Sequence, residues 1–180
     1  MAGRWHRSGR SADELLEVYR DNVDAVYAFF SYSVSHETAE DLTAATFERV
    51  VRSWSRFNPE TAGPRTWILA IARNLLADHF RRQSHRNAIS LDEHPALAAS
   101  LASSDDPAAR LLSTDTVRDW LARLEPRERE VLALRFAADL PAADVARQLG
   151  LSEANVHQIS SRAVRRLHNR ISSAELTGNG

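Results

Sequence analysis

A run of arginines near the end of the chain has the composition of a phosphate-binding helix face. Between residues 154 and 174 the sequence contains no acidic residue and four arginines, Arg162, Arg165, Arg166 and Arg170. A helix face that is merely solvated usually mixes its charges. Guanidinium groups match phosphate and guanine edges with two parallel donors. The pattern therefore favours a helix that binds nucleic acid.

The segment just before these arginines, ADVARQLGLSEANVHQIS (143–160), has the pattern of a helix-turn-helix unit. Gly150 supplies the turn residue that tolerates a positive φ, and Ser152 is placed to cap the second helix. Apolar residues line the inner faces of both predicted helices: Val145, Ala146, Leu149, Leu151, Val156 and Ile159. A helical hairpin without a ligand is the alternative. The arginines that follow favour DNA recognition.

A second basic segment, residues 65–86, contains five arginines and a single acid, Asp78. Its polar side chains recur at helical spacing, so that bases and phosphates could meet one face. Asp78 has a simpler alternative role, because an ion pair with Arg82 four residues later would also account for it. Trp67, in the apolar stretch before this face, fits core packing better than insertion into DNA.

Catalytic patterns are weak. HETAE (36–40) places Glu40 where a zinc protease helix needs its second histidine. The 7 histidines are dispersed and there is no cysteine, which excludes disulfides, thiol nucleophiles and cysteine-ligated zinc. We expect no enzyme activity, no metal and no cofactor.

The elements that must position these residues are helices, and the predicted fold class is all-α. Amphipathic or apolar patterns predict helices over 13–34, 37–54 and 64–82. Residues 87–112 are small, acidic and interrupted by two prolines, which predicts a flexible linker without a core. Helical patterns resume near residue 114. The sequence thus predicts two small helical domains, 12–86 and 113–171, joined by the linker 87–112, with tails at 1–11 and 172–180.

Charge and hydropathy are consistent with a cytoplasmic protein that binds DNA weakly when alone. The net charge of the 180 residues is −1, and every one of the 23 cations is arginine. The acids concentrate in the linker, so both predicted domains are slightly basic. No apolar run approaches the ~20 residues that span a bilayer, and we expect no membrane insertion.

Three segments together resemble the bacterial sigma-70 family, and the small extracytoplasmic-function (ECF) group in particular. They are AEDLTAATFERV, RTWILAIARNLLADHFRR and LEPREREVLALRFAADLPAADVARQLGLSEANVHQISSRAVRRL. The similarity covers about residues 12–86 and 113–170. It implies a promoter-specificity subunit of RNA polymerase that performs no chemistry of its own.

The resemblance implies roles for three sets of residues. Docking on the clamp helices of the largest core polymerase subunit falls to Glu40, Asp41, Leu42 and Thr43. Opening and holding the −10 element falls to Phe57, Asn58, Thr61, Arg73, Asn74, Asp78, Arg81 and Arg82. Binding of the −35 element falls to Ser152, Asn155, His157, Gln158, Ser161 and Arg162, with Arg165 and Arg166 on phosphates. The C-terminal domain would also rest on the flap of the second-largest subunit.

Two departures and one alternative accompany this interpretation. Ala44 and Ala45 replace the Gln-Glu-like pair that usually follows the docking residues, which removes two polar contacts. The second helix also differs from many relatives in its base-facing positions. An anti-sigma factor is a further candidate partner. The alternative function is a stand-alone helix-turn-helix regulator, which predicts a dimer on a palindrome of about 10-bp half-site spacing.

Overall fold

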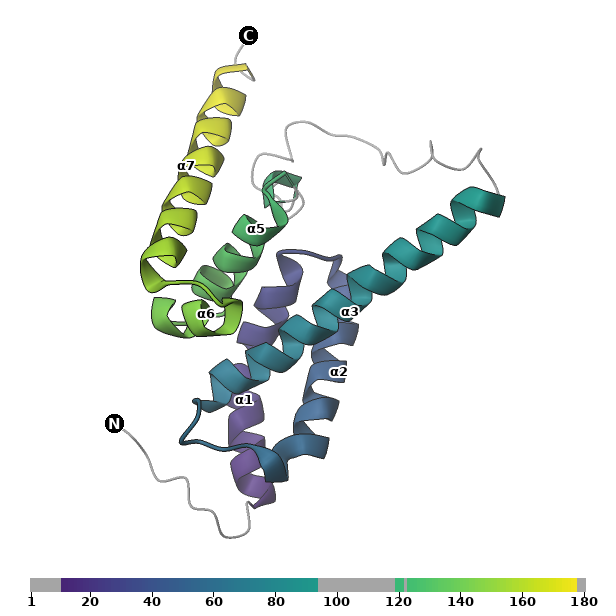
Figure 1. Cartoon of the computed structure of the whole chain (residues 1–180), viewed down its shortest axis with the longest axis vertical. Helices are drawn as coiled ribbons and strands as arrows, with labels where there is room; N and C mark the ends of the chain where they lie inside the picture. The colour runs from purple at the N-terminus through teal and green to yellow at the C-terminus, as the bar shows by residue number, and fades with distance from the viewer. Residues whose placement is uncertain (1–10, 94–118, 122, 178–180) are drawn as a thin grey trace.

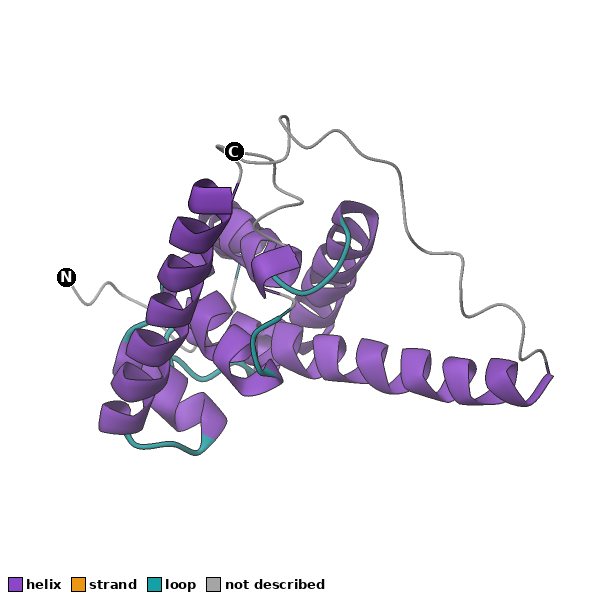
Figure 2. Ribbon diagram, turned by 90° about the horizontal axis from the view of Figure 1, so that it is seen from above, coloured by secondary structure: helices purple, strands orange, loops and turns teal. Residues whose placement is uncertain are grey.

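The computed structural model describes residues 11–93, 119–121 and 123–177, and all the regular structure in these ranges is helical (Figures 1 and 2). The expected linker from residue 94 to residue 112 lies outside the described residues, as does most of the helix expected from residue 114. Among the described helices, none is both long and apolar enough to cross a membrane.

The N-terminal domain is a bundle of three helices. They are α1 (Ala12–Ser31), α2 (His36–Ser53) and α3 (Pro64–Glu93), with the short helix η1 (Trp54–Arg56) after α2. Ser11 and Ser35 begin α1 and α2, since each hydroxyl accepts a backbone N–H three residues later. The bundle closes around side chains with no exposed surface, among them Val26, Phe29, Phe30, Val50, Ile68 and Leu69.

Helix α3 is longer than the sequence predicted. It continues to Glu93, so the seven residues after the predicted boundary at residue 86 are helical rather than linker. No proline or glycine interrupts the chain before Pro95, which allows the helix to continue. Figure 1 shows the end of α3 projecting beyond α1 and α2.

The C-terminal domain consists of shorter helices and one long one. After the helical residues 119–121 come α5 (Pro126–Leu132), the π-helical turn η3 (Ala133–Ala137), α6 (Ala142–Leu149) and α7 (Glu153–Thr177). Pro126 and a capping box between Glu125 and Glu128 begin α5. Helix α7 runs to Thr177, past the predicted domain end at residue 171.

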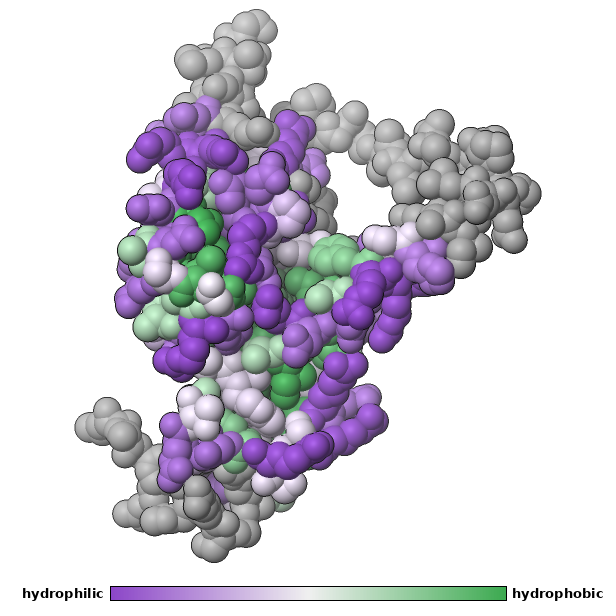
Figure 3. Space-filling model, viewed as in Figure 1, coloured by the Kyte–Doolittle hydropathy of each residue, from purple (hydrophilic) through white to green (hydrophobic). Residues whose placement is uncertain are grey.

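The two domains pack against each other around one continuous core. A single cluster of buried side chains contains Val26, Phe29 and Leu69 of the first domain together with Leu134, Leu140 and Val145 of the second. The sequence predicted both helical domains but not this packing. On the face seen in Figure 3, hydrophilic side chains dominate and the hydrophobic ones show as separate patches.

Candidate nucleic-acid interface

The turn between α6 and α7 is built as the sequence predicted. Gly150 adopts φ 64° and ψ 36°, the left-handed conformation that ends α6 and that glycine takes without strain. The Ser152 hydroxyl accepts a hydrogen bond from the backbone N–H of Asn155 at 3.2 Å and caps the new helix. Val156 and Ala163 are fully buried, which fixes the rotation of α7 about its axis.

This rotation places five of the predicted −35 residues together on the outer side of α7. They line a shallow surface hollow of about 440 Å³: His157, Gln158, Ser161, Arg162 and Arg165. All five are exposed, whereas Asn155 is half-buried. The Arg162 guanidinium is held only by a long bond of 3.4 Å from Nε to the Gln158 carbonyl oxygen. It is therefore free to reach outward.

Arg166 does not belong to that outer group in this structure. Its Nη1 donates to Oε2 of Glu128 at 2.9 Å, and the Glu128 side chain is only 12% exposed. Glu128 also accepts the backbone N–H of Glu125 in the capping box of α5. Arg166 thus fastens α7 to α5, and the prediction that it binds phosphate does not fit its position here.

Phe57, one of the predicted −10 residues, is a core residue instead. Its ring is 3% exposed and lies flat against the Trp54 ring, at 5.3 Å between centroids and 10° between planes. The Trp67 ring contacts it from another side at 4.9 Å, which agrees with the prediction that Trp67 packs in the core. A ring held between two tryptophans is not offered to a DNA base. The prediction for Phe57 is therefore wrong for this conformation.

Asn58 and Thr61 remain on the surface at the loop after η1. The Asn58 side-chain oxygen accepts the backbone N–H of Glu60 at 3.1 Å, and its carbonyl accepts that of Thr61. Both side chains are exposed. The loop is a turn held by its own asparagine, so these two residues can still meet a nucleic acid.

The predicted −10 residues on α3 divide between two faces. Asn74, Asp78, Arg81 and Arg82 lie on the outward side, and Asp78, Arg81, Arg82 and His85 line an open hollow of about 380 Å³. Asp78 pairs with Arg81 at 2.9 Å and lies 3.9 Å from Arg49, so Arg81 rather than Arg82 is its partner. Arg73 points the other way, toward the C-terminal domain.

The predicted polymerase-docking residues on α2 also point in different directions. Glu40 and Asp41 are exposed and Leu42 is half-buried. Thr43 is 8% exposed, and its hydroxyl donates to the Ala39 carbonyl at 2.7 Å, so it packs inward. Glu40 lies 3.4 Å from His36. The surface available to a partner is therefore made by Glu40, Asp41 and the exposed Ala44, with Leu42 beside them.

Signs of other chemistry are few in the described residues. They contain no group of three or more His, Asp or Glu side chains placed to hold a metal ion. Burial raises the pKa of Tyr32 and lowers the pKa of Arg129. The Arg129 guanidinium donates to the carbonyls of Leu121 and Leu124, which indicates a structural role.

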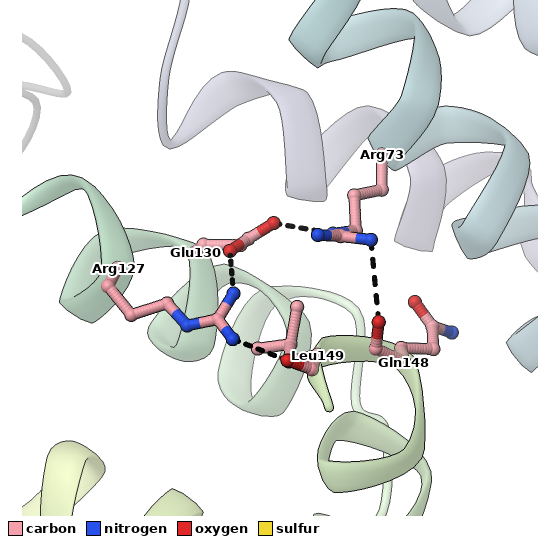
Figure 4. A network of polar contacts seen from close by, with 5 residues as sticks. All are labelled: Arg73, Arg127, Glu130, Gln148 and Leu149. Carbon is pink, nitrogen blue, oxygen red and sulfur yellow. Dashed lines mark hydrogen bonds and ion pairs between the residues drawn. The ribbon is translucent and has the colours of Figure 1, made fainter. Parts of the chain in front are cut away.

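A polar cluster between the domains was missed by sequence reasoning. It joins Thr66 and Arg73 of α3 to Glu130, Asp144 and Gln148 of the C-terminal domain. Figure 4 shows the part of this cluster around Glu130, with Arg73, Arg127 and Gln148. The pairs are separated by 57 to 82 positions in the chain. Each residue alone is an ordinary polar residue on a helix, so no local pattern identified the partners.

Comparison with known proteins identifies the two domains independently. The family model for Sigma-70 region 2 matches residues 18–86, and the model for Sigma-70, region 4 matches residues 120–169. The outward faces of α3 and α7 lie within these two matches. Each match contains one of the two basic stretches: residues 65–86 lie in the first, and Arg162, Arg165 and Arg166 lie in the second.

Three curated proteins that are similar to this chain are RNA polymerase sigma factors. The RNA polymerase sigma factor CarQ of Myxococcus xanthus is 34% identical over 124 residues, 68% of each protein. The ECF RNA polymerase sigma factor BldN of Streptomyces coelicolor is 34% identical over 157 residues, which are 87% of this chain but 60% of that protein. The ECF RNA polymerase sigma factor SigC of Mycobacterium tuberculosis is 29% identical over 87% of this chain and 80% of its own length.

Two solved structures share the fold. CnrH in complex with the cytosolic domain of CnrY has a TM-score of 0.64 at 23% identity, covering 97% of this chain and 94% of that chain. RpoE in complex with the anti-sigma factor NepR from Bartonella quintana has a TM-score of 0.59 at 24% identity, covering 87% and 93%. With the family models and the curated relatives, the helix-turn-helix unit and the two basic faces show that this chain belongs to the ECF group of the sigma-70 family of RNA polymerase sigma factors.

Proposed function

We propose that this chain gives promoter specificity to core RNA polymerase by contacting two DNA elements, one with each domain. The observation that carries the proposal is the pair of exposed basic faces, on α3 and on α7, each within a different sigma-70 region. Core polymerase forms the phosphodiester bonds, and the chain itself catalyses no reaction. Because bacterial polymerase works in the cytoplasm, we place the chain there.

In the C-terminal domain, α7 enters the major groove of the −35 element. An α-helix fits the width of the major groove, where each base pair presents a distinct pattern of hydrogen-bond donors and acceptors. Arg162 suits the two acceptors of a guanine, and Gln158 suits the donor and acceptor of an adenine. Arg165, on the same side of the helix, contacts phosphate. Arg166 would have to break its ion pair with Glu128 to contact phosphate, so we assign it a structural role in the domain.

In the N-terminal domain, the outward face of α3 and the loop after η1 hold the −10 element. Arg81 and Arg82 supply cations for the phosphates, while Asn58, Thr61 and Asn74 supply donors and acceptors for bases. Moving a base out of the duplex costs a few kcal/mol of pairing and stacking energy, and hydrogen bonds to the edge of that base must offset this cost. Since Phe57 is buried, stacking on its ring contributes nothing in this conformation.

The partners follow from the family. Exposed acids on α2, Glu40 and Asp41, suit docking on the clamp helices of the largest polymerase subunit, and the C-terminal domain suits the flap of the second-largest subunit. An anti-sigma factor is a further proposed partner, since RpoE was solved with one. Free DNA affinity should stay in the non-specific range, about 10⁻⁴–10⁻⁶ M at physiological salt, because the net charge is −1.

The test is transcription reconstituted from the purified chain and core polymerase on a library of genomic fragments, with sequencing of transcript 5′ ends. Discrete start sites that share two upstream motifs, and that are absent with core alone, support the proposal. A folded chain that gives no discrete starts with active core refutes it. In that case light scattering would show whether the chain is the dimer that a stand-alone regulator requires.

A further inference from the structure

The surface hollows on α7 and on α3 each contain one histidine among their arginines. On α7 the hollow of about 440 Å³ holds His157 together with Arg162. On α3 the hollow of about 380 Å³ holds His85 together with Arg82. One imidazole thus recurs in each of the two basic surfaces, although the two hollows lie on different domains.

The position of His157 is fixed by the rotation of α7. Val156, just before it, is fully buried, whereas His157 keeps 61% of its side-chain surface exposed. Its Nε2 lies 3.9 Å from Oε1 of Glu153, one turn earlier on the same helix. Arg162 and Arg165 share the hollow with it, and among the described residues only side chains of α7 line this hollow. The imidazole is therefore open to any molecule that lies along the outer face of α7.

His85 extends the outward face of α3 by one turn. It is exposed and lies three and four positions after Arg82 and Arg81, and seven after Asp78, which are spacings that share one side of a helix. All four residues line the α3 hollow. From a second helix, α2, the guanidinium of Arg49 reaches this cluster at 3.9 Å from Asp78. His85 is thus a further member of the α3 face, and one that the sequence did not assign to DNA.

An imidazole differs from a guanidinium because its charge depends on pH. Histidine gains its charge between about pH 8 and pH 5, whereas arginine stays charged throughout. The charged imidazole donates from both ring nitrogens and the neutral one from a single nitrogen. A hydrogen bond to phosphate is also stronger from a charged donor. In each hollow the arginine contacts are therefore permanent, while the full contact of the histidine requires a bound proton.

A DNA phosphate selects the protonated histidine. It attracts the charged imidazole by Coulomb interaction and has no comparable attraction for the neutral ring. Glu153 adds to this preference, because its carboxylate repels phosphate and a charged His157 at 3.9 Å offsets that repulsion. Binding of DNA therefore takes up protons wherever the histidines are neutral in the free chain. Affinity is then highest at low pH, where both are already charged, and it falls as the pH rises.

We propose that the proton is a second ligand in DNA binding by this chain, taken up by His157 on α7 and by His85 on α3. Each protonated imidazole contacts a phosphate beside the arginines of its hollow. The pH thus sets the affinity for DNA without any change in fold. This inference rests on the proposed function, since that function assigns both hollows to DNA, but proton uptake can be measured without polymerase or a known promoter.

The test measures the affinity of the full chain for a random-sequence duplex by fluorescence anisotropy, at about pH 5.5 and about pH 8. The duplex carries a dye whose emission does not depend on pH, and each titration is repeated at several salt concentrations. One phosphate contact steepens the slope of log K against log salt by about 0.9, which is about eight-fold in affinity at ~0.1 M salt. We expect the wild type to show this steeper slope and this higher affinity at the lower pH, on whichever face the duplex lies.

Two double variants separate these histidines from the general gain of positive charge at low pH. His85→Gln with His157→Gln removes the imidazole from both hollows, so slope and affinity at the lower pH should fall to the wild-type values at the higher pH. His36→Gln with His168→Gln removes two exposed histidines that line neither hollow, so the wild-type pH dependence should remain. Circular dichroism at both pH values checks that each variant is folded. Equal pH dependence in the two double variants would refute the proposal.

Arginine at each position shows which face acts. His157→Arg and His85→Arg supply a charge that does not depend on pH, so each should raise the affinity at the higher pH toward the value that the wild type has at the lower pH. His168→Arg adds the same charge to α7 outside the hollow, and His36→Arg does so on α2. If His157→Arg gains no more affinity than His168→Arg, the contact on α7 is refuted. The comparison of His85→Arg with His36→Arg decides the contact on α3 in the same way.

Proton uptake and the proposed function fail separately. A chain whose DNA affinity follows the protonation of His85 and His157, yet starts no transcription with core polymerase, keeps proton uptake and loses the proposed function. A chain that initiates at discrete promoters, yet has the same pH dependence in both double variants, keeps the function and loses proton uptake.

Discussion

Replacing Arg162 by alanine tests the assignment of α7 most sharply. The side chain is exposed, it lines the outer hollow with Gln158 and Ser161, and its one internal bond is 3.4 Å long. Its removal should therefore leave the domain folded. A two-point contact between arginine and guanine discriminates by about 1–3 kcal/mol, so transcription from a cognate promoter should fall about 5- to 150-fold.

The assay is transcription with reconstituted holoenzyme on matched templates, with and without a −35 element. The Arg162→Ala defect should appear only where the −35 element is present, and co-purification with core should be unchanged. Arg166→Ala is the matched control, because Arg166 pairs with Glu128 and does not line the outer hollow. It should lower the thermal stability of the domain more than it changes promoter preference. An equal loss for Arg162→Ala on templates of both kinds would refute a role in sequence recognition.

Three further variants test the other assignments. Asp41→Ala should weaken co-purification with core polymerase relative to Glu48→Ala, which removes an exposed acid from the same helix, and equal retention of both would remove Asp41 from the docking surface. Phe57→Ala should lower the free energy of unfolding by about 3–5 kcal/mol in a denaturant titration, because the ring is buried, whereas unchanged stability with lost promoter opening would restore it to the DNA site. Gly150→Ala should lower the free energy of unfolding by about 1–2 kcal/mol, because a residue with a Cβ is strained at φ 64°. No steric clash adds to this cost, since the Cβ would meet nothing within 4 Å. An unchanged free energy of unfolding would show that the turn can change conformation.

Local features of the fold were predictable because their causes are local. The cap at Ser152, the turn at Gly150 and the inward rotation of Val156 all depend on residues within one turn of each other. The structure confirms each of them. The apolar positions of α7 face inward and leave only its other side for polar residues. The sequence therefore also placed Gln158 and Arg162 on the outer face.

Features that depend on distant partners were not predictable. The family resemblance assigned Phe57 to the −10 element, and only the positions of Trp54 and Trp67 show that its ring is buried. Arg166 lies among four arginines with no acid nearby in the sequence, and its partner Glu128 is 38 residues earlier. Helix periodicity gives the face of a residue but not its partner, so the packing of the two domains also escaped prediction.

The central claim, that each domain reads its own promoter element, is tested most directly by transcription from a library with the upstream region randomised. Transcript yield for every template would be compared among wild-type holoenzyme, Arg162→Ala and Asn74→Ala. The account predicts two separated sequence preferences for the wild type, with Arg162→Ala weakening only the upstream one and Asn74→Ala, which removes a proposed base contact, only the downstream one. A single preference, or loss of both preferences in either variant, would contradict it.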